Sequence, residues 1–236
     1  MTGQLPLQIG LRPAATLDGF VAGDNAQVLA SVRTCALGTG EPLLFLAGPA
    51  GSGRTHLLAG ACNVAAAAGL RCAYLPLGEP TGLAPGLLGD LDALDLVCLD
   101  DLDGVAGDRQ WEEAVFALFN GLRDLGGRLI VAAAQGPTDL PLTLADLRSR
   151  LRWGLVLTVR PLRDEQLCTA LDAAAAARGL RLGDGVARYL VERLPRDLPA
   201  LIGVLDRLDH ASLAAKRPLT VPFVRACLTD LARLGD

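Results

Sequence analysis

The sequence is poor in aromatic residues, which make up 4% of its 236 residues. Proteins that hold single-stranded nucleic acid stack its bases on aromatic side chains, so this class is disfavoured. Neither end carries a basic run, and 22 Lys+Arg against 26 Asp+Glu give a net charge of −4. Because a surface that follows a phosphate backbone needs clustered positive charge, we expect no direct sequence-specific DNA binding.

The sequence also lacks the spacing of a metal site or of a membrane anchor. Its 6 cysteines form no CxxC pair, and there are only 2 histidines. Free thiols are typical of a reducing cytoplasm. The start, MTGQLPLQIG, has neither the charged segment nor the long apolar run of a signal peptide, and the other apolar runs are too short to cross a bilayer. We expect a cytoplasmic protein that binds no membrane.

What the sequence does contain is an alternation of short apolar runs and helical patterns. Helical patterns at 54–68, 109–125 and 143–151 separate apolar runs of the kind found in parallel strands. The runs are EPLLFLAG, RCAYLPL, LDLVCLDD, GRLIVAA and GLVLTV. This order predicts an α/β fold, a doubly wound parallel sheet of five strands. Strand patterns stop after residue 161, and helical patterns near 164–178, 184–193, 197–215 and 220–233 predict a small all-helical C-terminal domain.

The segment GPAGSGRT, residues 48–55, matches the phosphate-binding pattern G-x-x-x-x-G-K-[ST] except that Arg54 replaces the lysine. It follows one predicted strand and opens a predicted helix. Backbone amides of such a loop and of the helix N-terminus bind phosphate oxygens, and the Thr55 hydroxyl would bind Mg²⁺. The candidate nucleotide-binding residues are Gly48, Pro49, Ala50, Gly51, Ser52, Gly53, Arg54, Thr55 and His56.

Two carboxylates end the strand pattern LDLVCLD, at the edge where open α/β sheets bind ligands. Asp100 is the candidate magnesium-side carboxylate, and Asp101 stands where a glutamate often orients the attacking water. The alternative is a tight Gly/Pro turn and two aspartates that cap a strand; we prefer nucleotide binding because both motifs occur in the right order.

Arginine pairs with phosphate oxygens through a planar fork, not as a compact charge, so Arg54 predicts that binding survives while hydrolysis is slow. An ordinary ATPase with a working arginine stays open.

These motifs, the helical tail and the segment DLRSRLRWGLVLTVRPL together resemble the DnaA/Hda family of AAA+ proteins, almost end to end. Similar stretches are GDNAQVLASV, GSGRTHLL and LVCLDDLDGVAGDRQWEEAVFALFN. The resemblance implies an AAA+ P-loop NTPase fold with a helical lid, a bound ADP or ATP with Mg²⁺, and homo-oligomers. It also implies three parts of the chain: a terminal segment 1–12, a nucleotide-binding domain 13–160 and a lid domain 161–236. In the initiator DnaA a DNA-binding helix-turn-helix domain follows this module; because the sequence stops at Asp236, we expect this protein to lack that domain.

The resemblance assigns roles to two further arginines. Arg150, in LRSRLRWG, matches an arginine finger that completes a neighbour's nucleotide site, and Arg196, in LPRDLPAL, matches the sensor arginine of the lid. The alternatives are a surface arginine paired with an acid such as Asp146, and a salt bridge from Arg196 to Asp197 or Glu192. One departure is the segment 132–134, three alanines where AAA+ relatives carry a polar sensor, which again makes fast hydrolysis doubtful.

The N-terminal segment QLPLQI resembles the peptide by which replication proteins bind the sliding clamp of DNA polymerase. Gln4 would enter a polar pocket, and Leu5, Leu7 and Ile9 an apolar one; the alternative is a short edge strand. The leading hypothesis is an adaptor that, on the DNA-loaded clamp, presents Arg150 to ATP bound by DnaA and so inactivates the initiator. The rival hypotheses are a self-contained ATPase or loader and a recruitment module with no effect on hydrolysis.

Overall fold

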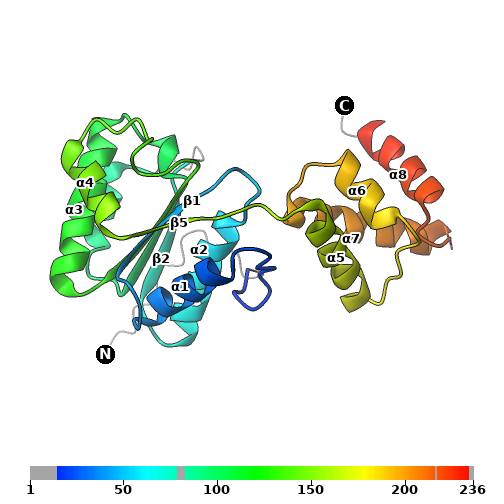
Figure 1. Cartoon of the computed structure of the whole chain (residues 1–236), viewed down its shortest axis with the longest axis horizontal. Helices are drawn as coiled ribbons and strands as arrows, with labels where there is room; N and C mark the ends of the chain where they lie inside the picture. The colour runs from blue at the N-terminus through cyan, green and yellow to red at the C-terminus, as the bar shows by residue number, and fades with distance from the viewer. Residues whose placement is uncertain (1–14, 79–82, 216, 234–236) are drawn as a thin grey trace. The chain divides into compact units, whose positions relative to one another are not determined.

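The computed structural model describes residues 15–78, 83–215 and 217–233. The chain divides between Pro161 and Leu162 into two compact units. The first unit contains a sheet with helices on both faces, and the second is helical (Figure 1).

The sheet of the first unit has five strands in the order β2-β3-β4-β1-β5, all of them parallel. The prediction of a five-stranded parallel sheet is confirmed. β5 differs from the expected buried strand, since its side chains alternate between half-buried and exposed. It lies at the edge, with a neighbour, β1, on one side only. The strand bounds are β1 Leu43–Ala47, β2 Cys72–Pro76, β3 Leu96–Asp100, β4 Arg128–Ala133 and β5 Leu155–Thr158.

Two helices cover each face of this sheet. α1 (Ala26–Leu37) and α2 (Arg54–Ala67) pack on one face, and α3 (Arg109–Leu125) and α4 (Ala145–Trp153) pack on the other. Short 3₁₀ turns, η1 (Pro85–Asp90) and η2 (Leu102–Gly104), flank β3. The sheet is therefore the middle layer of three, and the loop at 48–55 leads from β1 to α2.

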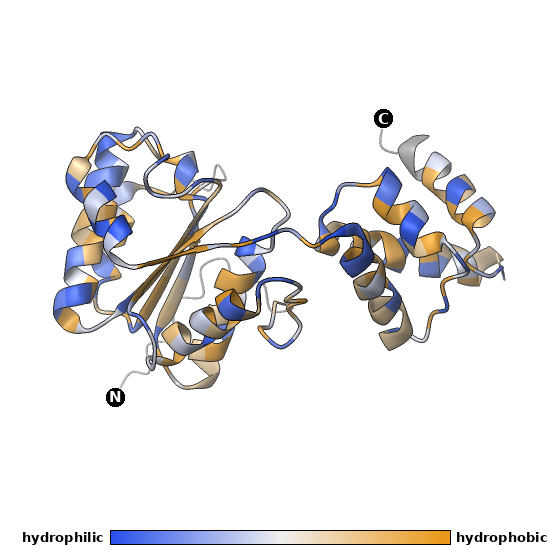
Figure 2. Cartoon of the chain, viewed as in Figure 1, coloured by the Kyte–Doolittle hydropathy of each residue, from blue (hydrophilic) through white to orange (hydrophobic). Residues whose placement is uncertain are grey.

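Helix α3 shows most plainly why a segment of this sequence is helical. Its N-cap residue, Asp108, accepts hydrogen bonds from the amides of Gln110 and Trp111, and Gly126 ends the helix in the left-handed conformation. Its buried residues recur at helical spacing, whereas the strands of the sheet are hydrophobic along most of their length (Figure 2).

The cysteines of the first unit are part of its core. Cys62 and Cys98 are fully buried, as their apolar surroundings in the sequence predict. Burial raises the pKa of the Cys35 thiol to about 12, so this side chain packs as a neutral apolar group. Among the described residues no group of histidine, cysteine and carboxylate side chains could hold a metal ion.

The second unit consists of α5 (Asp164–Ala177), α6 (Val186–Arg193), α7 (Leu198–Ala215) and α8 (Val221–Arg233). All four helices fall on the predicted helical patterns and share one apolar core, which includes Leu171, Leu190 and Leu205. In the part of the chain that the structure describes, no helix is long and apolar enough to cross a membrane.

Candidate functional site

The loop from Gly48 to Thr55 is shaped by glycines that no other residue could replace without strain. Gly53, at the start of α2, has φ 97°, and a Cβ there would lie 2.7 Å from the Phe20 ring. A Cβ on Gly48 would lie 2.4 Å from the carbonyl oxygen of Val159. The backbone therefore follows its tight course between the end of β1 and the first turn of α2, as the pattern predicts.

Two polar atoms of the loop are buried without a hydrogen-bond partner: Ser52 Oγ and Arg54 Nη1. Buried donors of this kind are costly unless a ligand or water satisfies them. They lie at the N-terminus of α2, where the helix dipole favours negative charge. The residues present therefore fit an anionic group such as a nucleotide phosphate.

The other end of the Arg54 guanidinium is already engaged. Arg54 is 9% exposed, and its Nη2 donates to Asp101 Oδ1 at 2.8 Å. Asp101 adopts φ 51°, which is uncommon for a residue with a side chain. The structure thus joins two residues that the sequence assigned separately, one to phosphate and one to the attacking water.

Asp100, at the end of β3, is held by its neighbours. It is 1% exposed, its Oδ2 accepts from the Tyr74 hydroxyl at 2.8 Å, and its Oδ1 accepts from the Asp101 amide at 3.1 Å. Tyr74 lies on β2, the strand next to β3. Sequence reasoning missed Tyr74, because it stands inside an apolar run that reads simply as core.

At the carboxyl end of β4, next to the end of β3, the chain offers backbone groups but no polar side chain. Ala132 and Ala133 are fully buried, and the amide of the exposed Ala134 donates to Asp103 Oδ1 at 2.8 Å. Asp103, in η2, was also missed by sequence reasoning, since a third aspartate after the strand reads as an ordinary turn residue. The three alanines leave the strand end without a polar side chain, in line with the departure from the family pattern noted in the sequence.

His56 contacts the segment that precedes α1. Its Nε2 lies 2.8 Å from the carbonyl oxygen of Thr16, and its ring packs edge-on against Phe20 with 5.5 Å between centroids. The segment that contains Thr16 and Phe20 therefore closes over the first turn of α2. Sequence reasoning assigned it no role in the site.

Arg150 lies on α4, in the helical layer opposite α2, and is not part of the core. Its Cζ stands over the Phe119 ring, 5.8 Å from the centroid, and Trp153, which is 67% exposed, packs edge-on against the same ring. An open hollow of about 420 Å³ on this helix is lined by Ala145, Arg148, Ser149, Arg150, Arg152 and Trp153. Three arginines and an exposed indole thus occupy one surface of the first unit.

Arg196 lies in the second unit, between α6 and α7, where its Nη2 donates to Asp164 Oδ2 at 3.1 Å. The sequence alternatives were Asp197 and Glu192, so the ion-pair partner is a residue that we did not consider. Asp197 instead accepts a hydrogen bond from the amide of Ala200 at the start of α7.

The candidate clamp-binding residues Gln4, Leu5, Leu7 and Ile9 lie outside the described residues.

Comparison with known proteins gives two family matches on this chain. The model of the bacterial DnaA ATPase domain matches residues 87–158, and the model of the Hda lid domain matches residues 164–228. Among solved structures, domain III of Thermotoga maritima DnaA is 22% identical with a TM-score of 0.78, covering 94% of this chain and 98% of that one.

Two further solved structures have the same fold. The replication initiator DnaA bound to AMPPCP and single-stranded DNA is 24% identical with a TM-score of 0.74; 85% of this chain is covered, and this chain spans 66% of the other. The Thermotoga maritima RuvB branch migration motor is 18% identical with a TM-score of 0.69, covering 94% of this chain and 73% of that one. The fold and the loop define an AAA+ P-loop protein with a C-terminal helical lid. The two family models lie one after the other along the sequence, so the chain combines a DnaA-type ATPase segment with an Hda-type lid domain.

Proposed function

We propose that the chain is a negative regulator of replication initiation that stimulates hydrolysis of ATP bound to DnaA. The observation that supports this proposal best is the position of Arg150, half-exposed on α4 and outside the core. A guanidinium buried inside its own unit could not reach a second protein. One that stands over an aromatic ring, whose face accepts no conventional hydrogen bond, keeps N–H groups available to a partner.

In this proposal Arg150 acts in trans. Water attacks the γ-phosphorus of the ATP held by DnaA, the bond to the bridging oxygen breaks, and ADP and phosphate are released. The Arg150 guanidinium donates hydrogen bonds to the phosphoryl oxygens, on which negative charge is spread in the transition state. An arginine finger accelerates this reaction about 10³- to 10⁵-fold.

The chain's own loop would hold ADP or ATP and turn it over slowly. Gly48–Thr55 would bind the phosphates, Arg196 would contribute from the lid, and Thr55 and Asp100 would face the Mg²⁺ that neutralises phosphate charge. Slow turnover is supported by the engagement of Asp101 with Arg54 and by the alanines at the end of β4. A carboxylate that pairs with a buried guanidinium is a poor base for water, because proton transfer to it would leave that cation uncompensated.

The sliding clamp would recruit the protein through Gln4, Leu5, Leu7 and Ile9. Burying three aliphatic side chains gains about 5–9 kcal/mol before losses, and ordering six residues costs about 6–12 kcal/mol in backbone entropy. A single segment should therefore bind weakly. Two segments of a homo-oligomer on one ring-shaped clamp would bind more tightly, because the second site is reached at a high effective concentration.

The test is ATP hydrolysis by purified DnaA with DNA-loaded clamp and added chain. We expect stimulation by the wild type, none without the clamp, and a strong reduction for Gln4→Ala. Rapid ATP turnover by the isolated chain would instead support the alternative, a self-contained ATPase or loader. Recruitment to DnaA with an unchanged hydrolysis rate would support a recruitment module and contradict our proposal.

A further inference from the structure

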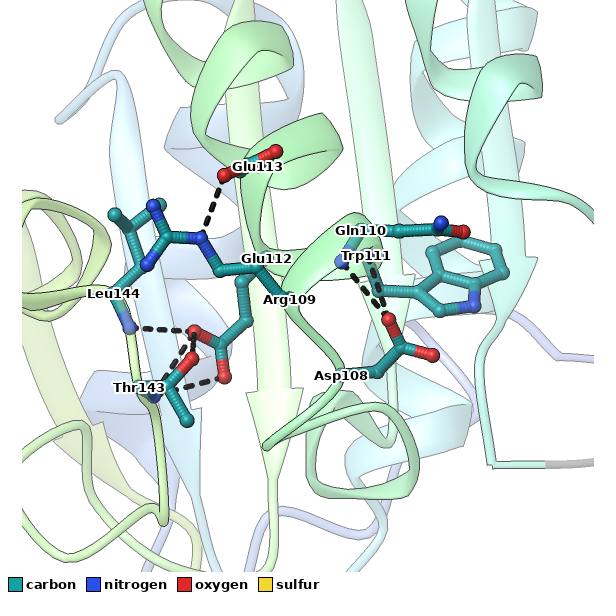
Figure 3. Close-up of polar contacts among 8 residues, drawn as sticks. All are labelled: Asp108, Arg109, Gln110, Trp111, Glu112, Glu113, Thr143 and Leu144. Carbon is teal, nitrogen blue, oxygen red and sulfur yellow. Dashed lines mark hydrogen bonds and ion pairs between the residues drawn. The ribbon is translucent and has the colours of Figure 1, made fainter.

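A buried carboxylate connects helices α3 and α4. Glu112, in the first turn of α3, is 2% exposed. Its oxygens accept hydrogen bonds from the amides of Gly107 (2.8 Å), Thr143 (2.9 and 3.0 Å) and Leu144 (2.6 Å), and from the Thr143 hydroxyl (2.8 Å). The side chain points at residues 143 and 144, while the neighbouring Glu113 pairs with Arg109 away from them (Figure 3).

Two of these amides, those of Thr143 and Leu144, directly precede α4, whereas Gly107 precedes α3. Leu144 is the N-cap residue of α4 and has no side chain that could cap it, so Glu112 supplies from another helix the negative charge that a cap normally provides. Burial raises the pKa of Glu112, but the hydrogen bonds from Thr143, Gly107 and Leu144 outweigh it, and the net pKa is lowered. The group is therefore an anion at neutral pH, at the positive end of the helix dipole.

Helix α3 contacts α4 at a second point, near the C-terminal end of α4. Phe119 follows Glu112 by about two helical turns, so both lie on one face of α3. Its ring lies under Arg150 and against Trp153. Leu147 and Leu151 are fully buried between these two points and fix the rotation of α4 about its axis. The Glu112 carboxylate holds the other end of α4, because it binds the backbone directly before the first helical residue.

We propose that Glu112 is a positioning residue for Arg150: its carboxylate fixes where α4 begins and so where the guanidinium is presented. This inference rests on the proposed finger role of Arg150. It goes beyond that role in naming a residue that never contacts the partner's nucleotide but controls the finger through the N-terminus of its helix.

The experiment compares Glu112→Gln with Glu113→Gln in the clamp-dependent hydrolysis assay. Both variants remove one negative charge from the same turn of α3, but glutamine at 112 would place an amide nitrogen, a donor, against donors. We expect Glu112→Gln to reduce the stimulated rate about 10- to 100-fold, the range for a displaced reacting group, and Glu113→Gln to leave it unchanged. Equal rates for the two variants would overturn the inference.

A second comparison separates positioning from general destabilisation. If Glu112 acts through Arg150, Glu112→Gln lowers the rate in the wild-type background and has no further effect in Arg150→Ala. A further loss in the Arg150→Ala background would overturn the inference. Thr143→Ala removes the hydroxyl hydrogen bond to Glu112 and leaves the charge of Glu112 in place. This variant replaces Glu112→Gln in the comparison if Glu112→Gln fails to fold. We expect it to give a smaller loss with the same dependence on Arg150.

A third measurement needs no partner protein. Trp153 ends α4, so in a Trp111→Phe background its fluorescence anisotropy reports the order of that helix. We expect Glu112→Gln to lower the anisotropy and Glu113→Gln to leave it unchanged; no change in either variant would overturn the inference. If the wild type fails to stimulate DnaA while Glu112→Gln still loosens Trp153, the proposed function fails, and the structural link from Glu112 to α4 stands by itself.

Discussion

Arg54 and Arg150 belong to the same unit and have contrasting surroundings. Arg54 is 9% exposed and pairs with a carboxylate of its own chain, whereas Arg150 is half-exposed and lies over an aromatic ring. A carboxylate takes up N–H donors and neutralises the charge, while a ring contacts the guanidinium plane and leaves its edges free to donate. The contrast supports a division of work in which the loop retains a ligand and α4 presents donors to another molecule.

The largest effect is expected from Arg150→Ala. Without the guanidinium, clamp-dependent hydrolysis of DnaA-bound ATP should fall about 10³-fold or more, measured as single-turnover release of phosphate. Arg152→Ala is the matched control, since Arg152 lies on the same helix, is exposed and carries the same charge. An equal loss in both variants would mean that the net positive charge of α4 matters, and that no specific finger exists.

Asp101→Ala tests the role of Arg54, the buried arginine of the comparison. This change leaves the buried Arg54 guanidinium without its carboxylate, and we expect the free energy of unfolding to fall by about 1–3 kcal/mol. Both tryptophans of the chain, Trp111 and Trp153, lie in this unit, so their fluorescence during urea unfolding follows it.

Asp103→Ala is the control for Asp101→Ala. Asp103 is exposed and accepts a hydrogen bond from the Ala134 amide, which water can reach, so its loss should cost less than about 1 kcal/mol. Added ADP should restore part of the stability of Asp101→Ala, because a ligand that binds the native state stabilises it. Equal destabilisation by the two variants would contradict a special role of the Arg54–Asp101 pair.

Acid should weaken the link between α3 and α4 selectively. Because the pKa of Glu112 is lowered in the folded protein from the ordinary 4.5, the unfolded chain binds this proton first as pH falls. Glu112 therefore stabilises the fold fully above pH 4.5, and this contribution is lost as pH falls toward the folded pKa, at up to about 1.4 kcal/mol per pH unit.

The measurement is urea unfolding of the wild type and Glu112→Gln across this acidic range. The difference in free energy between the two should shrink as pH falls, while a series with Glu113→Gln should keep the pH dependence of the wild type. A difference that stays constant with pH would show that folding leaves the pKa of Glu112 unchanged, and a difference that grows as pH falls would show that its pKa is raised; either result would contradict the lowered pKa.

The sequence predicts those parts of the molecule whose signals are local. Apolar runs between helical patterns identify the five strands, and the loop at 48–55 is recognisable because glycines at fixed spacing lie between a strand and a helix. The same approach missed α1, although Val28, Val32 and Cys35 are buried at helical spacing. The polar residue before that helix, Asn25, makes no side-chain cap; it exchanges two hydrogen bonds with the backbone of Arg160.

The missed features of the candidate site are long-range pairings. Arg54 meets Asp101, Tyr74 meets Asp100, and Glu112 meets Thr143, each across more than 20 residues of sequence. Such pairs depend on which strands and helices become neighbours in the fold. A glutamate in the pattern QWEEAV reads as solvent-exposed, and only the packing of α4 on α3 turns it into a buried anion.

The smallest effect concerns Arg196, which the resemblance assigns to the same bound phosphates as Arg54. Its ion pair with Asp164 is exposed, with side chains 66% and 43% accessible, so the pair should contribute less than about 1 kcal/mol to stability. Asp164→Asn should release Arg196 and raise the affinity for ADP less than about tenfold, while Arg196→Ala should lower it; titration with a fluorescent ADP analogue measures both. Arg193→Ala, which removes an arginine stacked on Tyr189 in the same unit, is the control and should leave the affinity unchanged. A lower affinity in Asp164→Asn would mean that the ion pair helps Arg196 to bind the nucleotide, and that Arg196, like the buried Arg54 with Asp101, depends on a carboxylate of its own unit.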